Sequence, residues 1–211
     1  MDTLRLYVHV PIASFRAAQA REYWETYPCP PPSTVYGMLL SLVGEPDRLV
    51  HQGAEIAIAI LSRPPISTVL RTLWRIKSAK TPPGIGSNKR PDFAELLTDV
   101  RLSVWVRRGT DQSNPPLLDR LHCALENPAS VSRFGGLSLG ESQFLVNEAR
   151  SWRHTDPLAG WALTADEKGN LALPIWPDHV GAKGTRWAQF SLRRADHLEP
   201  TPSMWTAILP P

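Results

Sequence analysis

Several features that assign a protein to a common class are missing or rare in this sequence of 211 residues. Its two cysteines, Cys29 and Cys123, form no CxxC motif and cannot by themselves hold a structural zinc ion. There is no apolar run of about 18 residues, and the first ten residues carry Asp2, Arg5 and His9, which argues against a membrane span and a secretory leader. These absences predict a soluble, cytoplasmic protein.

Motifs for catalysis and nucleotide binding are also missing. The six histidines show neither HExxH nor close metal-ligand spacing, and there is no GxSxG nucleophile motif. The glycine-rich segment 133–142 lacks the Lys-Ser/Thr pair of a P-loop and does not match GxGxxG. A general acid–base site built from His9 or His154 with Tyr7 or Tyr23 would need no metal, but nothing in the sequence requires it. We therefore expect no catalytic residue, no metal and no cofactor.

Lysine is scarce, with 5 residues against 18 arginines. Arginine grips phosphates with two parallel N–H groups, so the bias suggests contact with phosphate or nucleic acid, although a GC-rich genome would produce it too. The position of the charges is more informative. Residues 63–108 hold ten basic and three acidic residues, a balance of +7, whereas the whole chain carries only +3 and the remainder therefore −4. This asymmetry predicts a surface that binds a polyanion.

Proline is abundant, with 21 residues, which excludes long uninterrupted helices. Alternating apolar residues predict strands, and apolar residues at helical spacing predict two helices. Strands 54–62 and 67–76 are expected to pair across the Arg63-Pro64-Pro65 turn. The strands expected before residue 151 are 4–10, 54–62, 67–76, 97–106 and a short one at 144–146, and the expected helices are 34–43, with Ser33 as N-cap, and about 115–126.

The order strand, helix, strand, strand, loop, strand, helix is typical of the ferredoxin-like (RRM-like) α+β fold. Here a long projecting hairpin would be inserted between the middle strands. The tryptophan-rich segment after residue 151 predicts short strands that pack as a second layer.

Three segments have the chemistry to bind nucleic acid. The basic hairpin would present Arg75 and Lys77 on one strand face, about 6.5–7 Å apart, which suits successive phosphates of a single strand, although charged edge strands also prevent aggregation. The N-terminus of helix 34–43 can accept a phosphate, and segment 133–142 can cradle one or simply form a tight turn. Trp24 and Trp74 are candidates for base stacking, while core packing is the more common role of tryptophan.

Three stretches resemble one known family. They are Pro11-Ile12-Ala13-Ser14-Phe15-Arg16, then Thr26-Tyr27-Pro28 with Pro31-Pro32-Ser33-Thr34-Val35-Tyr36-Gly37-Met38-Leu39, and Leu139-Gly140-Glu141-Ser142. Together they are similar to the Cas5 family of type I CRISPR systems, which belongs to the RAMP superfamily. The resemblance covers about residues 3–150, and the rest matches only in being rich in strands.

The resemblance implies a ferredoxin-like RNA-binding domain over residues 1–135, with a β-hairpin thumb at about 75–99. A glycine-rich loop and a small C-terminal β-rich part would follow at 136–211. It also implies a Cascade subunit that caps the 5′ handle of the crRNA in RNA-guided DNA targeting for antiviral defence. The expected partners are the crRNA 5′ handle, the Cascade backbone subunit, the large subunit and target DNA near the flanking motif, with no membrane.

One branch of this family cleaves precursor RNA without a metal, whereas most branches do not cleave. We therefore expect a non-catalytic subunit, with a pre-crRNA endoribonuclease as the alternative. A scaffold whose basic face binds an acidic protein is a third possibility. The RNA-binding residues implied by the family motifs are Ser14, Phe15, Arg16, Ser33, Thr34, Tyr36, Gly136, Gly140 and Ser142, and those added by charge and position in the hairpin are Arg71, Arg75, Lys77, Lys80, Lys89 and Arg90.

Overall fold

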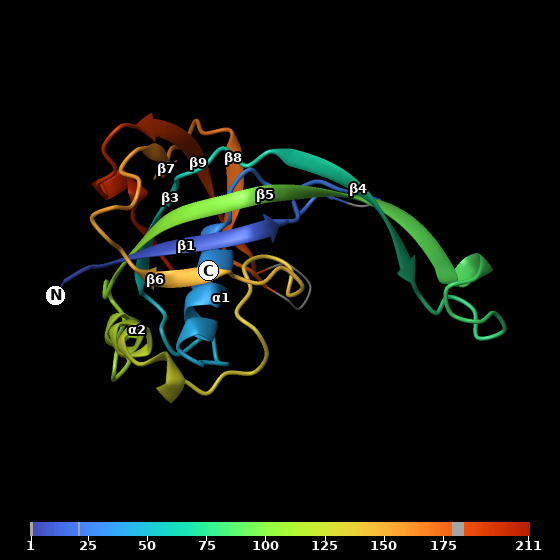
Figure 1. Ribbon diagram of the computed structural model, residues 1–211, viewed down its shortest axis with the longest axis horizontal. Helices are drawn as coiled ribbons and strands as arrows, with labels where there is room; N and C mark the ends of the chain where they lie inside the picture. Colours follow the sequence, from blue (N-terminus) through green and yellow to red (C-terminus); the bar gives the residue numbers. More distant parts are fainter. Residues whose placement is uncertain (1, 21, 179–183) are drawn as a thin grey trace.

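The computed structural model describes residues 2–20, 22–178 and 184–211. Figure 1 shows a body from which one long, curved arm projects. The described strands form one ten-stranded sheet, and its main path runs β6-β1-β5-β3-β7-β9-β8. Within the described chain the named strands pair antiparallel, except that β2 is parallel to β5. The mixed α+β class predicted from the sequence is confirmed.

Two long strands, β1 (Leu4–Ala13) and β5 (Lys89–Arg107), form the centre of the body. They pair with Leu4 opposite Val106 and Val10 opposite Val100. β3 (Glu55–Ile60) lies along the other edge of β5, and β6 (Glu148–Ser151) lies along the other edge of β1. Because the side chains of a strand alternate between its two faces, every second residue of β1 enters the core, namely Leu4, Leu6, Val8 and Val10.

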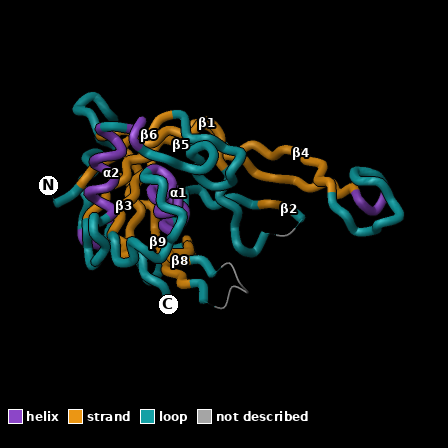
Figure 2. Tube along the Cα trace, turned by 90° about the horizontal axis from the view of Figure 1, so that it is seen from below, coloured by secondary structure: helices purple, strands orange, loops and turns teal. Residues whose placement is uncertain are grey.

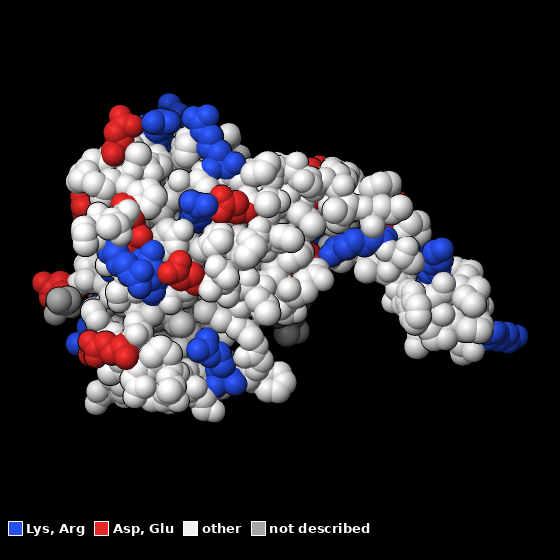
Figure 3. All heavy atoms as spheres, in the orientation of Figure 1, with Lys and Arg blue, Asp and Glu red and all other residues white. Residues whose placement is uncertain are grey.

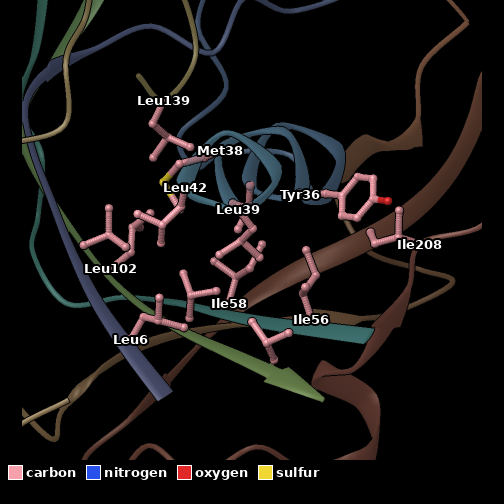
Figure 4. Close-up of a cluster of buried hydrophobic side chains, with 14 of the residues drawn as sticks. Leu6, Tyr36, Met38, Leu39, Leu42, Ile56, Ile58, Leu102, Leu139 and Ile208 are labelled. Carbon is pink, nitrogen blue, oxygen red and sulfur yellow. The ribbon is translucent and has the colours of Figure 1, made fainter. Parts of the chain in front are cut away.

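Two helices, α1 (Pro32–Leu42) and α2 (Leu117–Glu126), share this core. Figure 4 shows side chains of α1 meeting aliphatic residues of the sheet. Leu39 of α1 is fully buried, and burial of such a side chain contributes about 1.5–3 kcal/mol. Both predicted helices are confirmed: α1 begins two residues earlier than 34, and α2 two residues later than 115.

The C-terminal strands β7 (Gly160–Ala165), β9 (Arg186–Ala195) and β8 (Leu171–Trp176) continue the same sheet beyond β3. The predicted second layer is therefore wrong, because β7 is hydrogen-bonded directly to β3. The sheet nevertheless reaches α1 a second time, where the rings of Tyr36 and Trp176 lie 6.4 Å apart. The short β10 (Thr206–Ala207) pairs with β3.

The projecting arm is a hairpin of β4 (Ile66–Trp74) and the first half of β5, closed by a tip loop of residues 75–88. We call these residues, 66–97, the thumb. Pairing runs from Ile66 opposite Leu97 to Trp74 opposite Lys89. Figure 2 shows the short β2 (Tyr23–Trp24) beside its base, and β2 pairs with β5.

The predicted pairing of 54–62 with 67–76 is wrong. β3 and β4 both pair with β5, β3 with residues 102–107 and β4 with residues 89–97. Between these two stretches Asp99 adopts φ +59°, a left-handed conformation that is uncommon outside glycine. Its carboxylate accepts hydrogen bonds from His9 (3.1 Å) and Arg101 (2.9 Å), which hold this irregular point of β5 in place.

The division into domains 1–135 and 136–211 stays a prediction. β6 to β10 come from the second of these ranges, and β6, β7 and β10 are hydrogen-bonded to strands of the first. No helix in the described part of the chain is long and apolar enough to cross a membrane.

Candidate nucleic-acid interface

A hollow of about 480 Å³ lies where the three family-like stretches meet. One wall is the first loop, residues 14–16, directly after β1. The floor is α1, and the glycine-rich loop, residues 133–146, closes another side. The C-terminal part adds Trp187 of β9. The lining comprises Ser14, Phe15, Arg16, Ala18, Tyr27, Pro31, Ser33, Thr34, Gly37, Met38, Ser41, Ser138, Gly140, Glu141, Pro174, Pro177 and Trp187.

α1 presents its small residues to the hollow. Ser33, Thr34, Gly37 and Ser41 recur at helical spacing, so they share one face while the larger residues enter the core. A Cβ atom on Gly37 would meet nothing within 4 Å. The helix surface is therefore open enough for the backbone of a ligand to lie against it.

The start of α1 differs from the prediction. Pro31, not Ser33, is the N-cap, and no side chain caps the helix. The amides of Thr34 and Val35 donate to the Pro31 carbonyl at 2.9 and 3.1 Å, which removes two donors from the expected phosphate site. A phosphate here would meet the amide of Ser33 and the hydroxyl groups of Ser33 and Thr34.

The first loop places its predicted residues in different surroundings. Ser14 and Phe15 are almost fully buried, and the Oγ atom of Ser14 has no hydrogen-bond partner among the described residues. Such buried hydroxyls are normally paired, so this one offers a donor and acceptor at the wall of the hollow. Arg16 lies at its rim, with a hydrogen bond of 3.2 Å to the Ala20 carbonyl.

Tyr36 does not reach the hollow, so its predicted contact with RNA is not supported. Figure 4 shows it among the core residues near Ile208. Its hydroxyl donates to the Arg48 carbonyl at 2.9 Å, and burial raises the pKa of this phenol. The reason is its place on α1, one residue before Gly37 but on the buried face.

The glycine-rich loop docks against the first loop. Gly140 has φ +91°, and a Cβ atom there would lie 2.5 Å from the Ser14 carbonyl oxygen, so only glycine allows this close approach. The amides of Leu139, Phe144 and Val146 donate within the loop, which leaves fewer N–H groups for the expected phosphate cradle. Gly136 and Ser142 are exposed and lie outside the lining of the hollow.

Beside the hollow, four residues from four segments form a polar cluster. The guanidinium groups of Arg16 and Arg71 lie 4.0 and 4.4 Å from the ring of Trp24, and Arg71 forms a 3.1 Å ion pair with Glu141. With two guanidinium groups against its ring, Trp24 is a poor candidate for base stacking.

Trp187 is the better candidate, because it lines the hollow and 44% of it is exposed. Trp187 is not among the stacking candidates predicted from the sequence. The alternation of β9, which turns Phe190 inward, would have placed Trp187 on the open face.

The tip of the thumb carries Arg75, Lys77, Lys80 and Lys89. β4 ends at Trp74, so the prediction that Arg75 and Lys77 share a strand face is wrong. The tip loop is organised by Asn88, which is buried and was not singled out from the sequence. Its Oδ1 accepts from the amides of Lys77 and Ser78 at 2.7 and 2.9 Å, and its Nδ2 donates to carbonyls of the same loop.

Four of the ten basic residues between 63 and 108 are paired with carboxylates of the described chain: Arg71, Arg90, Arg101 and Arg107. Arg90, for example, contacts Asp92 at 2.7 Å. Figure 3 accordingly shows separate blue groups along the thumb, divided by uncharged surface, on the face in view. The +7 balance therefore overstates the free positive charge, which is concentrated at the tip.

One face of the thumb is apolar and open. Leu70 lies opposite Phe93 in the register, and Leu70 and Trp74 are 64% and 73% exposed. Large exposed apolar surfaces mark interaction sites. The charge pattern predicts a basic hairpin, whereas the exposed apolar face of the thumb is a feature that the charge pattern does not predict.

The acid–base candidates lie away from the hollow. His9 contacts Asp99 and Asn147, and Tyr23 donates to Glu95 at 3.0 Å, but neither lines the hollow. Among the described residues, no group of three His, Cys, Asp or Glu side chains is arranged to hold a metal ion.

A Ser–His–Asp set exists elsewhere, in the buried network of His51, Asp111 and Ser113. Ser113 Oγ and Asp111 both approach Nδ1 of His51, at 2.7 and 3.1 Å, and Arg120 donates to Nε2 at 3.0 Å. The histidine thus has no free nitrogen to activate a nucleophile, and the network is structural: Asp111 also accepts from the Leu117 amide at the start of α2.

Comparison with known proteins gives consistent matches. The family model described as CRISPR-associated protein (Cas_Cas5) matches residues 3–149. A CRISPR-associated protein Cas5 of Myxococcus xanthus (strain DK1622) is 47% identical over 186 residues, covering 87% of each chain.

Two solved structures share the fold. A chain of a CRISPR RNA-guided surveillance complex has a TM-score of 0.60 at 13% identity, covering 96% of this chain and 95% of that one. A crystal structure of a Cas protein has a TM-score of 0.50 at 16% identity, covering 92% and 93%.

Proposed function

This chain belongs to the CRISPR-associated Cas5 family, and we propose that it is a Cascade subunit that binds and caps the 5′ handle of the crRNA. The observation that carries the proposal is the convergence of the first loop, α1 and the glycine-rich loop on one hollow. The glycine-rich loop is far from the other two segments in the sequence, and all three are segments that resemble the family. Further support comes from the surveillance-complex chain with which this protein shares its fold.

We also assign the body to the ferredoxin-like class. The first four strands of the sheet path lie in the order β6-β1-β5-β3, with α1 between β1 and β3 in sequence and α2 between β5 and β6. That arrangement is the split βαβ pattern of RNA-recognition domains.

In the hollow, the small residues of α1 would admit the sugar–phosphate backbone. Arg16 would contact a phosphate, the Ser14 hydroxyl would complete a hydrogen bond, and Trp187 would stack on an unpaired base. The cations of the thumb tip would contact the RNA further along. The backbone subunit, the large subunit and target DNA near the flanking motif are the other proposed partners, in a role in antiviral defence.

We propose that the subunit is non-catalytic. The titratable side chains that line the hollow are Arg16, Tyr27 and Glu141, and the described lining contains no histidine or lysine to act as a general base or acid near neutral pH. The alternative, a metal-independent pre-crRNA endoribonuclease, predicts specific cleavage of a repeat-containing RNA in the presence of EDTA. Intact RNA after long incubation with the folded protein supports the non-catalytic role.

The hollow is tested by filling it. Gly37→Phe would place a ring in the open space above α1 without displacing protein atoms near the Cβ position. We expect at least a tenfold loss of affinity for single-stranded RNA carrying the repeat-derived 5′ handle of the host's own array, measured by fluorescence anisotropy. Gly37→Ala is the matched control, because it leaves the hollow open and favours the helix by about 0.5–1 kcal/mol. Equal RNA binding by Gly37→Phe and Gly37→Ala would contradict the assignment of the hollow.

A further inference from the structure

A carboxylate lines the hollow that we assign to RNA. Glu141 projects from the glycine-rich loop into the lining, whereas its partner Arg71, on β4, is not part of the lining. A negative group at this place would repel a phosphate, and a second positive group beside Arg16, the guanidinium of Arg71, is held by that same carboxylate. The pair therefore needs an explanation beyond simple stability.

The ion pair leaves several polar atoms unsatisfied. Only Nη1 of Arg71 contacts Glu141, at Oε2. Nε and Nη2 of Arg71 and Oε1 of Glu141 are buried and have no hydrogen-bond partner within the described chain. Each buried group without a partner costs about 1–3 kcal/mol, so the contact is less favourable than a fully bonded pair would be.

The two free nitrogens of Arg71 have a defined shape. Nε–H and one N–H of Nη2 point in the same direction along one edge of the planar guanidinium, and such an edge binds two oxygens of a phosphate at once. Trp24 fixes the plane of this group through the contact at 4.4 Å. Arg71 is thus oriented and has an unused bidentate edge.

We propose that Glu141 and a backbone phosphate of the RNA compete for Arg71. Both nitrogens of the Nε–Nη2 edge are buried, so a phosphate reaches them only when the contact between the glycine-rich loop and the thumb opens, and this opening separates Glu141 from Nη1 of Arg71. This inference rests on the proposed function, because the phosphate is that of the RNA in the hollow. It makes Glu141 a regulator of affinity and Arg71 a phosphate ligand.

The test is a double-mutant cycle read out by RNA affinity. Glu141→Gln keeps the size and polarity of the side chain but removes the competing charge, so we expect roughly three- to tenfold tighter binding of the same handle RNA. Arg71→Gln should weaken binding. In the Arg71→Gln background, Glu141→Gln should give no gain, because no arginine remains to be released.

The matched control is Glu167→Gln, which removes an exposed carboxylate outside the hollow and should leave affinity within about twofold. If Arg71→Gln does not fold, Arg71→Lys replaces it, since lysine keeps the charge but lacks the bidentate edge.

The outcomes separate the two proposals. Failure of the wild-type protein to bind the RNA overturns the proposed function itself. If the wild type binds but Glu141→Gln binds equally or more weakly, only the competition is wrong. A gain that persists in the Arg71→Gln background would reflect general charge removal and would also overturn it.

Discussion

The hollow and the thumb are built in opposite ways. The hollow joins the first loop and α1 to the glycine-rich loop and β9, which come much later in the chain, and its walls are held by buried residues such as Ser14, Phe15 and Leu139. The thumb is two neighbouring strands and a loop, with apolar and charged side chains open to solvent. A hollow with rigid, buried walls suits the recognition of a ligand of one defined shape. An open hairpin, in contrast, gains stability when a partner covers its exposed side chains.

The largest expected effect concerns the contributions of the body and the thumb to the free energy of unfolding. Leu39→Ala, in the fully buried centre of α1, should lower the free energy of unfolding by about 2–5 kcal/mol because it leaves a cavity. Leu70→Ala, on the open face of the thumb, should change it by less than about 0.5 kcal/mol. Urea unfolding followed by circular dichroism measures both, and similar losses would show that the thumb is part of the cooperative core.

The acid sensitivity of the body is the next prediction. Burial alone would raise the pKa of Asp111, but hydrogen bonds from Leu117, Ser113 and His51 outweigh it and hold the pKa below the ordinary 3.8. A carboxyl whose pKa is lower in the folded than in the unfolded state stabilises the fold when the pH is above the unfolded-state pKa. This stabilisation is lost as the pH falls through the folded-state pKa. Stability should therefore drop below about pH 4.

The variant Asp111→Asn tests whether Asp111 causes this loss of stability at low pH. It should lower stability at pH 7 by about 1–3 kcal/mol and flatten the acid limb of the profile. Urea midpoints between pH 3 and 7 provide the measurement. An unchanged acid limb would assign the sensitivity to other carboxylates with lowered pKa values, such as Asp156 beside Arg150.

A smaller and local effect is expected at the tip of the thumb. Asn88→Ala removes the side chain that binds the carbonyls and amides of residues 77–82. The tip should then be cut by proteases at least several times faster, while the unfolding midpoint of the body stays the same. Asn114→Ala, outside the thumb, serves as the control, and equal cleavage of the two variants would contradict the role of Asn88.

The smallest effect concerns the charges of the tip. Arg75→Gln with Lys77→Gln should weaken RNA binding for all sequences alike and reduce the slope of log affinity against log salt by about 1.4, since each phosphate contact on a single strand contributes about 0.7. Gly37→Phe should reduce affinity more strongly. The reverse order would make the thumb, and not the hollow, the main RNA contact.

The sequence predicted much of the body because local patterns determine it. Alternation in β1 and the apolar spacing of α1 and α2 report burial directly. The partner of a strand is a non-local choice, and for this reason the pairing of β4 was predicted wrongly: β5 is long enough, at 19 residues, to pair with β4 along its first half and with β3 along its last residues.

The candidate site shows the same limit. The family-like stretches include the three segments that line the hollow, but the direction of each side chain depends on packing. Tyr36 and Gly37 are adjacent, yet one enters the core and the other lines the hollow. Asn88 and Glu141 have their roles through contacts in the folded chain, and no residue spacing in the sequence predicts these contacts.

The continuous strand β5 also determines how the length of the thumb can vary. Because β4 and β5 leave the body as an antiparallel pair, adding two residues to each strand would lengthen the thumb by about 7 Å and preserve which side chains face which way. Adding one residue to each would exchange the two faces beyond the insertion. Thumb length can therefore change in steps of two residue pairs while α1 and the hollow keep their geometry, so distance to a neighbour and recognition within the body can diverge separately among relatives.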